Sequence, residues 1–167
     1  MDDTEGLNAF LEVSKSYYIG PKNLDIGGDP FLNRLICDVL DISNVVYNPL
    51  IPKYNVLSDR KYHTVTSFSV LNILVKKVGG QYVFDKKAAR CHIELCIWSL
   101  IPYGGRIYIK VFEGDRRGVC GKTPQYIYAQ TNMNWLQYQP VLAEICEENG
   151  CELYVEHVMR GYVIRNS

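Results

Sequence analysis

A chain of 167 residues is long enough for one domain, and 47% hydrophobic with 22% charged residues is the balance of an ordinary globular protein. Its 18 basic and 18 acidic side chains give a net charge of zero, so the protein as a whole does not attract polyanions. Any contact with nucleic acid must therefore be local. The sequence shows neither a signal-peptide pattern nor an apolar run of membrane-spanning length. These features predict a cytoplasmic protein that has no membrane partner.

The six cysteines are expected to be reduced. Most of them lie in apolar, helix-like segments, where a thiol behaves as a small hydrophobic side chain. The sequence contains no C-x-x-C pair and no familiar spacing of zinc ligands, so we predict no metal site.

The first predicted elements after an N-terminal segment are a strand over residues 23–28 and a helix over 29–41. The strand is a short apolar run that ends in two glycines. Asp29 suits the N-cap of the helix, and Pro30 suits its first position, where a missing N–H costs nothing. One apolar face is predicted from side chains at helical spacing, namely Leu32, Leu35, Ile36, Val39 and Leu40.

The middle of the chain continues the alternation of strands and helices. A second strand is predicted over 45–49, and the β-branched start of 63–74 predicts another, whose second half could open a helix. After a break at two glycines, an apolar stripe predicts a helix that begins near Asp85 and stops at Pro102.

The last part of the chain holds the clearest strand, residues 106–112, which is rich in β-branched and aromatic side chains. A long loop over 113–130 follows it. The next helix ends at Glu148, and Pro140 either kinks this helix or marks its start. Two final strands within 151–167 are predicted to form an antiparallel hairpin.

This order predicts a doubly wound α/β fold, which is a mostly parallel sheet with helices on both faces and an antiparallel C-terminal hairpin strand. We expect residues 1–22 to form an N-terminal segment and residues 23–167 to form one compact domain. In such sheets ligands bind beyond the carboxyl ends of the strands. The loop that leaves the first strand is therefore the predicted site.

Four residues in that loop suit one kind of ligand: Asp25, Gly27, Gly28 and Asp29. Glycines permit a tight turn and let a ligand approach bare backbone, while a helix N-terminus attracts a carboxylate. Asp25 could accept a hydrogen bond from an ammonium group. The loop therefore suits an amino-acid-like headgroup.

This loop is the first of several features that occur in a fixed order along the chain. Its run is L-D-I-G-G-D, Asn48 closes the second strand, and the segment T-S-F-S-V-L-N-I-L belongs to the strand after that. A helix, a P-x-G-G turn, a strand and an antiparallel last strand complete the order. From Asn23 to Asn166 the chain resembles the class I S-adenosylmethionine-dependent methyltransferases, which have a Rossmann-like fold.

The resemblance implies S-adenosylmethionine as the cofactor and methyl transfer as the reaction. The cofactor-binding residues that it implies are Asp25, Gly27, Gly28, Asp29, Asn48, Pro49, Asp59, Ser67 and Phe68. The residues expected to meet the substrate are Asn72 and, in the loop after the fifth strand, Arg116, Arg117 and Tyr128. The implied catalytic residues are Ser67 and Lys110.

Each of these roles has a structural alternative. Asp25 could satisfy loop amides, Asn48 could form an Asx turn, and Asn72 could cap a helix. His63 and His92 are interpreted as structural rather than catalytic.

The acceptor is not identified and could be a small molecule or a nucleic acid. Ribose 2′-O-methylation is less favoured, because Lys110 fits the lysine that such enzymes carry on the fifth strand but Ser67 stands where they carry aspartate. A non-catalytic binding or scaffold protein is the alternative, since Asn48 replaces an acidic residue and Asp29-Pro30 replaces further glycine. A dinucleotide enzyme is disfavoured because the sequence lacks G-x-G-x-x-G spacing.

Overall fold

The computed structural model describes residues 3–28, 33–48, 62–111, 129–131 and 133–166. The elements in chain order are α1 (Asp3–Ser16), β1 (Lys22–Ile26), α2 (Asn33–Leu40), β2 (Ser43–Tyr47), β3 (Thr64–Phe68), the 3₁₀ turn η2 (Leu71–Ile73), β4 (Val75–Val78), β5 (Gln81–Phe84), α3 (Lys86–Ser99), β6 (Arg106–Lys110), the 3₁₀ turn η3 (Trp135–Tyr138), α4 (Gln139–Glu148), β7 (Glu152–Glu156) and β8 (Gly161–Arg165). None of the described helices is both long and apolar enough to cross a membrane.

Within the described part of the chain, six strands form one sheet in the order β2-β1-β3-β6-β8-β7. The four strands from β2 to β6 are parallel, whereas β8 is antiparallel to both β6 and β7. The chain runs from β1 to β2 on one side and then to β3 on the other, so the strand order reverses at β1. The predicted fold class, a mostly parallel sheet with an antiparallel C-terminal hairpin, is confirmed.

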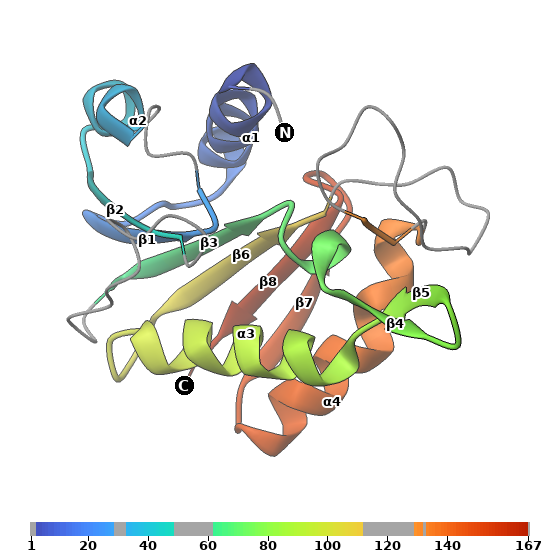
Figure 1. Cartoon of the computed structure of the whole chain (residues 1–167). Helices are drawn as coiled ribbons and strands as arrows, with labels where there is room; N and C mark the ends of the chain where they lie inside the picture. The colour runs from blue at the N-terminus through green and yellow to red at the C-terminus, as the bar shows by residue number, and fades with distance from the viewer. Residues whose placement is uncertain (1–2, 29–32, 49–61, 112–128, 132, 167) are drawn as a thin grey trace.

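Helices cover both faces of the sheet, as Figure 1 shows. The helices α1 and α2 lie on one face, and α3, α4 and the β4–β5 hairpin lie on the other. The larger apolar cluster joins the sheet to α3 and α4 and includes Leu24, Ile93 and Ile107. A smaller cluster under α1 includes Phe10 and Tyr108. The sheet therefore has two cores, one on each face.

The apolar face that the sequence predicted for the helix over 29–41, which is α2 in the structure, is only partly buried. Ile36 is buried in α2, but 44% of Leu35 and 52% of Val39 are exposed. The reason is the position of α2 above the edge strand β2, where the sheet ends and covers only part of the helix surface. The predicted apolar face is therefore not buried at these two residues.

The second half of 63–74, which the sequence left open as the start of a helix, does not form an α-helix. The chain makes only the single turn η2 and then enters an antiparallel hairpin of β4 and β5. Gly79 and Gly80 join the two strands with φ angles of +58° and +81°, the left-handed values that a two-residue type I′ turn requires. A pair of glycines suits both central positions of such a turn, and here it ends β4 rather than a helix.

Three helix boundaries have the chemistry typical of helix ends. The Asp85 side chain accepts a hydrogen bond from the Ala88 N–H at 3.0 Å and thereby caps α3. Pro140 lies in the first turn of α4, so it begins the helix and does not kink it. Gly150 follows α4 with a φ of +66°, as a C-terminal cap requires.

A glycine in β8 sets the spacing between the central strands. Gly161 pairs with Lys110 on β6 and with Glu156 on β7. A Cβ atom at this position would lie 2.1 Å from the Ile109 carbonyl oxygen. We therefore expect G161A to push β6 and β8 apart and to lower the free energy of unfolding by about 3 kcal/mol, measured by urea titration. A loss below about 1 kcal/mol would contradict this close approach.

Candidate functional site

The turn after β1 exposes bare backbone at the carboxyl end of the strand. Gly27 is exposed and has a φ of +77°, which side-chain-bearing residues rarely adopt. Its N–H donates to the Tyr47 carbonyl at 2.8 Å and extends the pairing of β1 with β2. A Cβ atom here would lie 2.8 Å from Cγ2 of Val70. Both the conformation and the space at this position require glycine.

The acidic residue of β1 lies directly beneath this turn. Asp25 is 4% exposed, and its Oδ1 accepts a hydrogen bond from Oγ1 of Thr66 on β3 at 3.0 Å. A Cβ atom at Gly28 would meet Oδ2 of Asp25 at 1.8 Å, so only glycine lets the carboxylate approach the turn. From the end of β2, Nδ2 of Asn48 donates to the Gly28 carbonyl at 3.2 Å. The structure thus brings together four residues that the sequence predicted for the site.

Three of the residues predicted to contact the cofactor or the substrate point in different directions. Oγ of Ser67 lies 2.7 Å from Nε2 of His92 beneath α3, and both residues are buried. Phe68 faces the other side of the sheet and packs against a phenylalanine of α1. Nδ2 of Asn72 donates to Oε1 of Gln130 at 3.1 Å. Their predicted contacts with cofactor or substrate stay predictions.

His92 is a buried polar residue whose pairing the sequence interpretation missed. Burial lowers the pKa of His92 from 6.5 to about 4, so the imidazole is neutral at pH 7. The spacing of residue 92 along the helix indicates its burial. It lies three positions after Ala89 and four before Cys96, and the side chains of Ala89 and Cys96 are fully buried. His92 therefore lies on the buried face of α3.

The predicted catalytic lysine lies at the carboxyl end of β6, on the face covered by α1. Nζ of Lys110 forms an ion pair with Oε2 of Glu12 at 2.9 Å, and its side chain is 18% exposed. Nearby, the Tyr17 hydroxyl donates to Oε2 of Glu156 at 2.8 Å. Burial and this carboxylate raise the pKa of Tyr17 to about 12. The α1 segment thus contacts the sheet through two polar interactions that the sequence did not predict.

The remaining predicted site residues lie outside the described residues, and their roles stay predictions. These residues are Asp29, Pro49, Asp59, Arg116, Arg117 and Tyr128.

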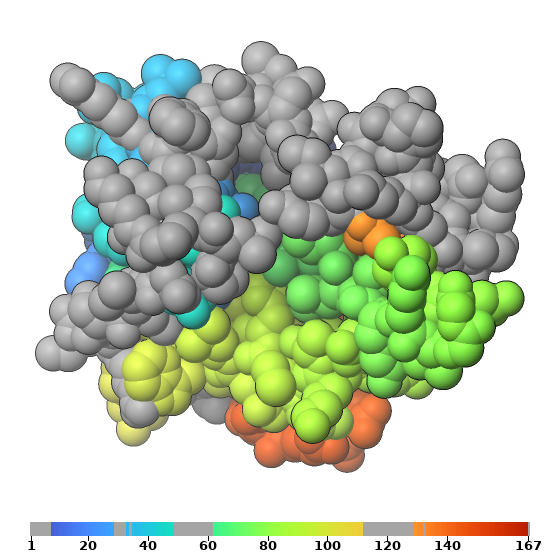
Figure 2. All heavy atoms as spheres, in the orientation of Figure 1, coloured from blue at the N-terminus to red at the C-terminus, as the bar shows by residue number. Residues whose placement is uncertain are grey.

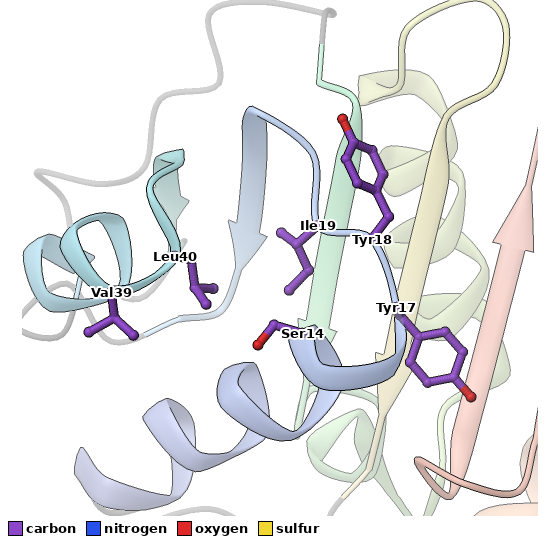
Figure 3. A pocket seen from close by; sticks show the side chains of 6 residues that line it. All are labelled: Ser14, Tyr17, Tyr18, Ile19, Val39 and Leu40. Carbon is purple, nitrogen blue, oxygen red and sulfur yellow. The ribbon is translucent and has the colours of Figure 1, made fainter.

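A hollow of about 330 Å³ lies at the other end of the sheet (Figure 3). It is lined by Ser14 of α1, by residues 17–19 before β1, and by Val39 and Leu40 at the end of α2. These segments lead into the amino ends of β1 and β2, whereas ligands of doubly wound sheets bind at the carboxyl ends. We therefore place the candidate site at the glycine turn. Figure 2, in the same orientation as Figure 1, shows the surface of the β4–β5 hairpin (green) beside that of α3 (yellow-green), with atoms of α4 (orange) below them.

Known structures decide what kind of fold this is. The complex of DhpI with S-adenosylhomocysteine superimposes with a TM-score of 0.58 and 12% identity, covering 98% of this chain and 85% of that one. The 1,6-didemethyltoxoflavin-N1-methyltransferase of Burkholderia thailandensis, with bound S-adenosylhomocysteine, gives a TM-score of 0.52 and 14% identity, covering 99% and 80%. This chain has the class I methyltransferase fold.

Comparisons of sequence add nothing to this result, because no protein-family model matches the chain and no curated protein matches it either. In the methyltransferase fold, β1 with its glycine turn takes the place that the resemblance predicted for the first strand. β3 and β6 are the strands that the sequence predicted within 63–74 and 106–112. Residues 49–61, between β2 and β3, lie outside the described residues. At 12% and 14% identity the likeness shows the fold alone, so each residue role rests on the geometry of this chain.

Proposed function

We propose that the chain binds S-adenosylmethionine at the turn after β1 and transfers its methyl group to an acceptor, which is a small molecule or a nucleic acid. The observation that carries this proposal is the exposed, left-handed Gly27 directly above the buried Asp25 carboxylate. Both lie at the carboxyl edge of the sheet, beside the reversal of strand order. The S-adenosylhomocysteine in both solved neighbours supports the same cofactor class.

The residues of the turn have chemistry that fits this cofactor. When bound, S-adenosylmethionine supplies a methyl group that is already activated on a sulfonium. The protein's task is therefore to hold and orient the reactants. Asp25 offers a carboxylate to the cationic amino group, and Gly27 leaves room for the ligand beside the backbone. The hydrogen bond from Asn48 to Gly28 keeps the turn in this shape.

Calorimetric titration with S-adenosylhomocysteine tests the binding half of the proposal. We expect a dissociation constant in the range of about 1 μM to 1 mM, the usual range for enzyme substrates. Mass spectrometry of ligand that purifies with the protein provides an independent test. No heat at millimolar ligand and no co-purified nucleoside would contradict cofactor binding.

A non-catalytic binding or scaffold protein is the second candidate function. The observation that favours it is the state of the two predicted catalytic side chains. Ser67 is buried against His92, and Lys110 is paired with Glu12. Binding of S-adenosylhomocysteine without methyl transfer to any of a panel of nucleotides, RNA oligomers and small hydroxyl or amine acceptors would favour this function over the enzyme.

Substitution of Lys110 tests its predicted catalytic role. If the acceptor is a hydroxyl, we expect K110Q to lower turnover by about 100-fold, the usual contribution of a positioned acid or base. S-adenosylhomocysteine affinity should change less than about threefold, because Lys110 lies on β6 rather than at the glycine turn. E12Q is the control, since it removes the ion pair but keeps the lysine. Equal turnover of K110Q and wild type would exclude Lys110 as a catalytic residue.

A further inference from the structure

The face of the sheet beneath α2 is polar where the opposite face is apolar. On β1, Leu24 and Ile26 belong to the apolar core, whereas Asn23 and Asp25 point to the other face. Asn23 and Thr66 have no exposed surface, and Asn44 is 5% exposed. Buried polar groups are costly unless they are hydrogen-bonded. Such a cluster in the middle of a sheet therefore calls for a reason beyond packing.

These side chains form one continuous row of hydrogen bonds that ends at the candidate site. Nδ2 of Asn44 donates to Oδ1 of Asn33 on α2 at 3.0 Å. Nδ2 of Asn23 donates to Oδ1 of Asn44 at 2.7 Å and to Oγ1 of Thr66 at 3.1 Å. Oγ1 of Thr66 then donates to Oδ1 of Asp25 at 3.0 Å. We call the five residues Asn33, Asn44, Asn23, Thr66 and Asp25 the polar row.

The direction of the bonds in the polar row is fixed. A second threonine, Thr64, donates to Oδ1 of Asn23 at 2.7 Å and accepts from the Gly20 N–H at 3.2 Å. The amide oxygen of Asn23 is thereby an acceptor, so its amide nitrogen is the group that faces Thr66. Because the Thr66 hydroxyl has one proton and already accepts from Asn23, that proton points to Asp25.

We propose that Thr66, oriented by Asn23, is a positioning residue that fixes the Asp25 carboxylate for the ammonium group of an amino-acid-bearing ligand. This inference rests on the proposed function, since it concerns the same site. Valine has the shape of threonine and suits a buried strand, so packing alone does not require the hydroxyl. A fully bonded polar network holds its members rigidly, and pre-organised groups bind ligands more tightly.

The test compares two ligands and four proteins by calorimetry. S-adenosylhomocysteine carries the amino-acid part, whereas 5′-methylthioadenosine lacks it. We expect T66V to weaken S-adenosylhomocysteine binding about tenfold and to leave methylthioadenosine binding within about twofold, because only the first ligand presents an ammonium to Asp25. T66S keeps the hydroxyl and should restore the affinity to within about threefold of wild type.

A buried hydroxyl outside the polar row supplies the control. Ser99, at the end of α3, has no exposed surface, and its Oγ donates to the Leu95 carbonyl at 2.8 Å. S99A removes a buried hydroxyl, as T66V does, and should change S-adenosylhomocysteine affinity less than about threefold. This contrast separates positioning from a general loss of structure.

Three outcomes would overturn the inference. The first is unchanged S-adenosylhomocysteine affinity in T66V while G27A abolishes it, a result that leaves the proposed function intact. The second is equal weakening of both ligands, which would indicate a purely structural hydroxyl. The third is no binding to the wild-type protein, which would also overturn the proposed function. If T66V does not fold, T66C replaces it in the same comparison, because cysteine is similar in size and is a weaker hydrogen-bond donor.

Discussion

Replacement of Gly27 by alanine is expected to abolish detectable binding of S-adenosylhomocysteine in a chain that still folds. The φ of +77° costs a residue with a Cβ atom about 1 to 2 kcal/mol. That Cβ atom would also lie 2.8 Å from Val70, so the turn must move to accept it. Since the turn is the proposed ligand contact, this movement removes the site. Calorimetry at up to millimolar ligand, with circular dichroism of the same samples, measures both parts.

Gly104 offers a matched control for the backbone strain. Its φ is +74°, and a Cβ atom there would meet nothing within 4 Å. It lies in the turn before β6, at the amino end of that strand. We expect G104A to cost about the same strain as G27A but to leave ligand affinity unchanged. Wild-type affinity in G27A would show that the ligand does not bind at this turn.

Acid should destabilise the protein through His92. Burial lowers the pKa of His92 to about 4 in the folded protein, against 6.5 in the unfolded chain. Between these two values the unfolded chain binds more protons, so the free energy of unfolding falls as the pH falls from about 6.5 to about 4. The two pKa values correspond to a loss of about 3 kcal/mol between pH 7 and pH 4.

Urea titrations at pH 7 and pH 4 of the wild type and H92Q measure this contribution. The variant should be less stable than the wild type at pH 7, because it disturbs the buried contact with Ser67. Its stability should depend less on pH by about 3 kcal/mol, since glutamine does not titrate. H157Q is the control, because His157 is exposed and its removal should leave the acid loss in place. An equal acid loss in H92Q and wild type would contradict the assignment to His92.

Much of the fold could be predicted because the local patterns were strong. Residues 106–112 combine β-branched and aromatic side chains, and β6 was found there. The helix after Asp85 and the hairpin at the C-terminus were also confirmed. The β4–β5 hairpin was missed because the two glycines were interpreted only as a break. Turn chemistry would have indicated a hairpin, since a pair of glycines suits both central positions of a type I′ turn.

The candidate site could be predicted where its parts lie on one strand and its exit turn or at the end of a neighbouring strand. Asp25, Gly27 and Gly28 meet because they share one strand and its exit turn, and Asn48 joins them because β2 pairs with β1. Ser67 and Phe68 are adjacent on β3 and therefore face opposite sides of the sheet, which alternation along the strand would have shown.

Contacts between distant segments could not be predicted from the sequence. Glu12 meets Lys110 across 98 positions of the chain, and Tyr17 meets Glu156 across 139. Both contacts depend on how α1 lies across the sheet, which residue patterns within α1 do not determine. Exposed ion pairs such as the one between Glu12 and Lys110 contribute little to stability, so no sequence pattern indicates them.

The place of β8 between β6 and β7 has a consequence for synthesis of the chain. β8 follows both of its neighbours in sequence, so β6 has an unpaired edge from the moment it forms until β8 emerges from the ribosome. Unpaired edges readily recruit strands of other molecules. A nascent or truncated chain that stops before Gly161 is therefore expected to aggregate readily. The sheet is complete only after β8 has inserted between β6 and β7.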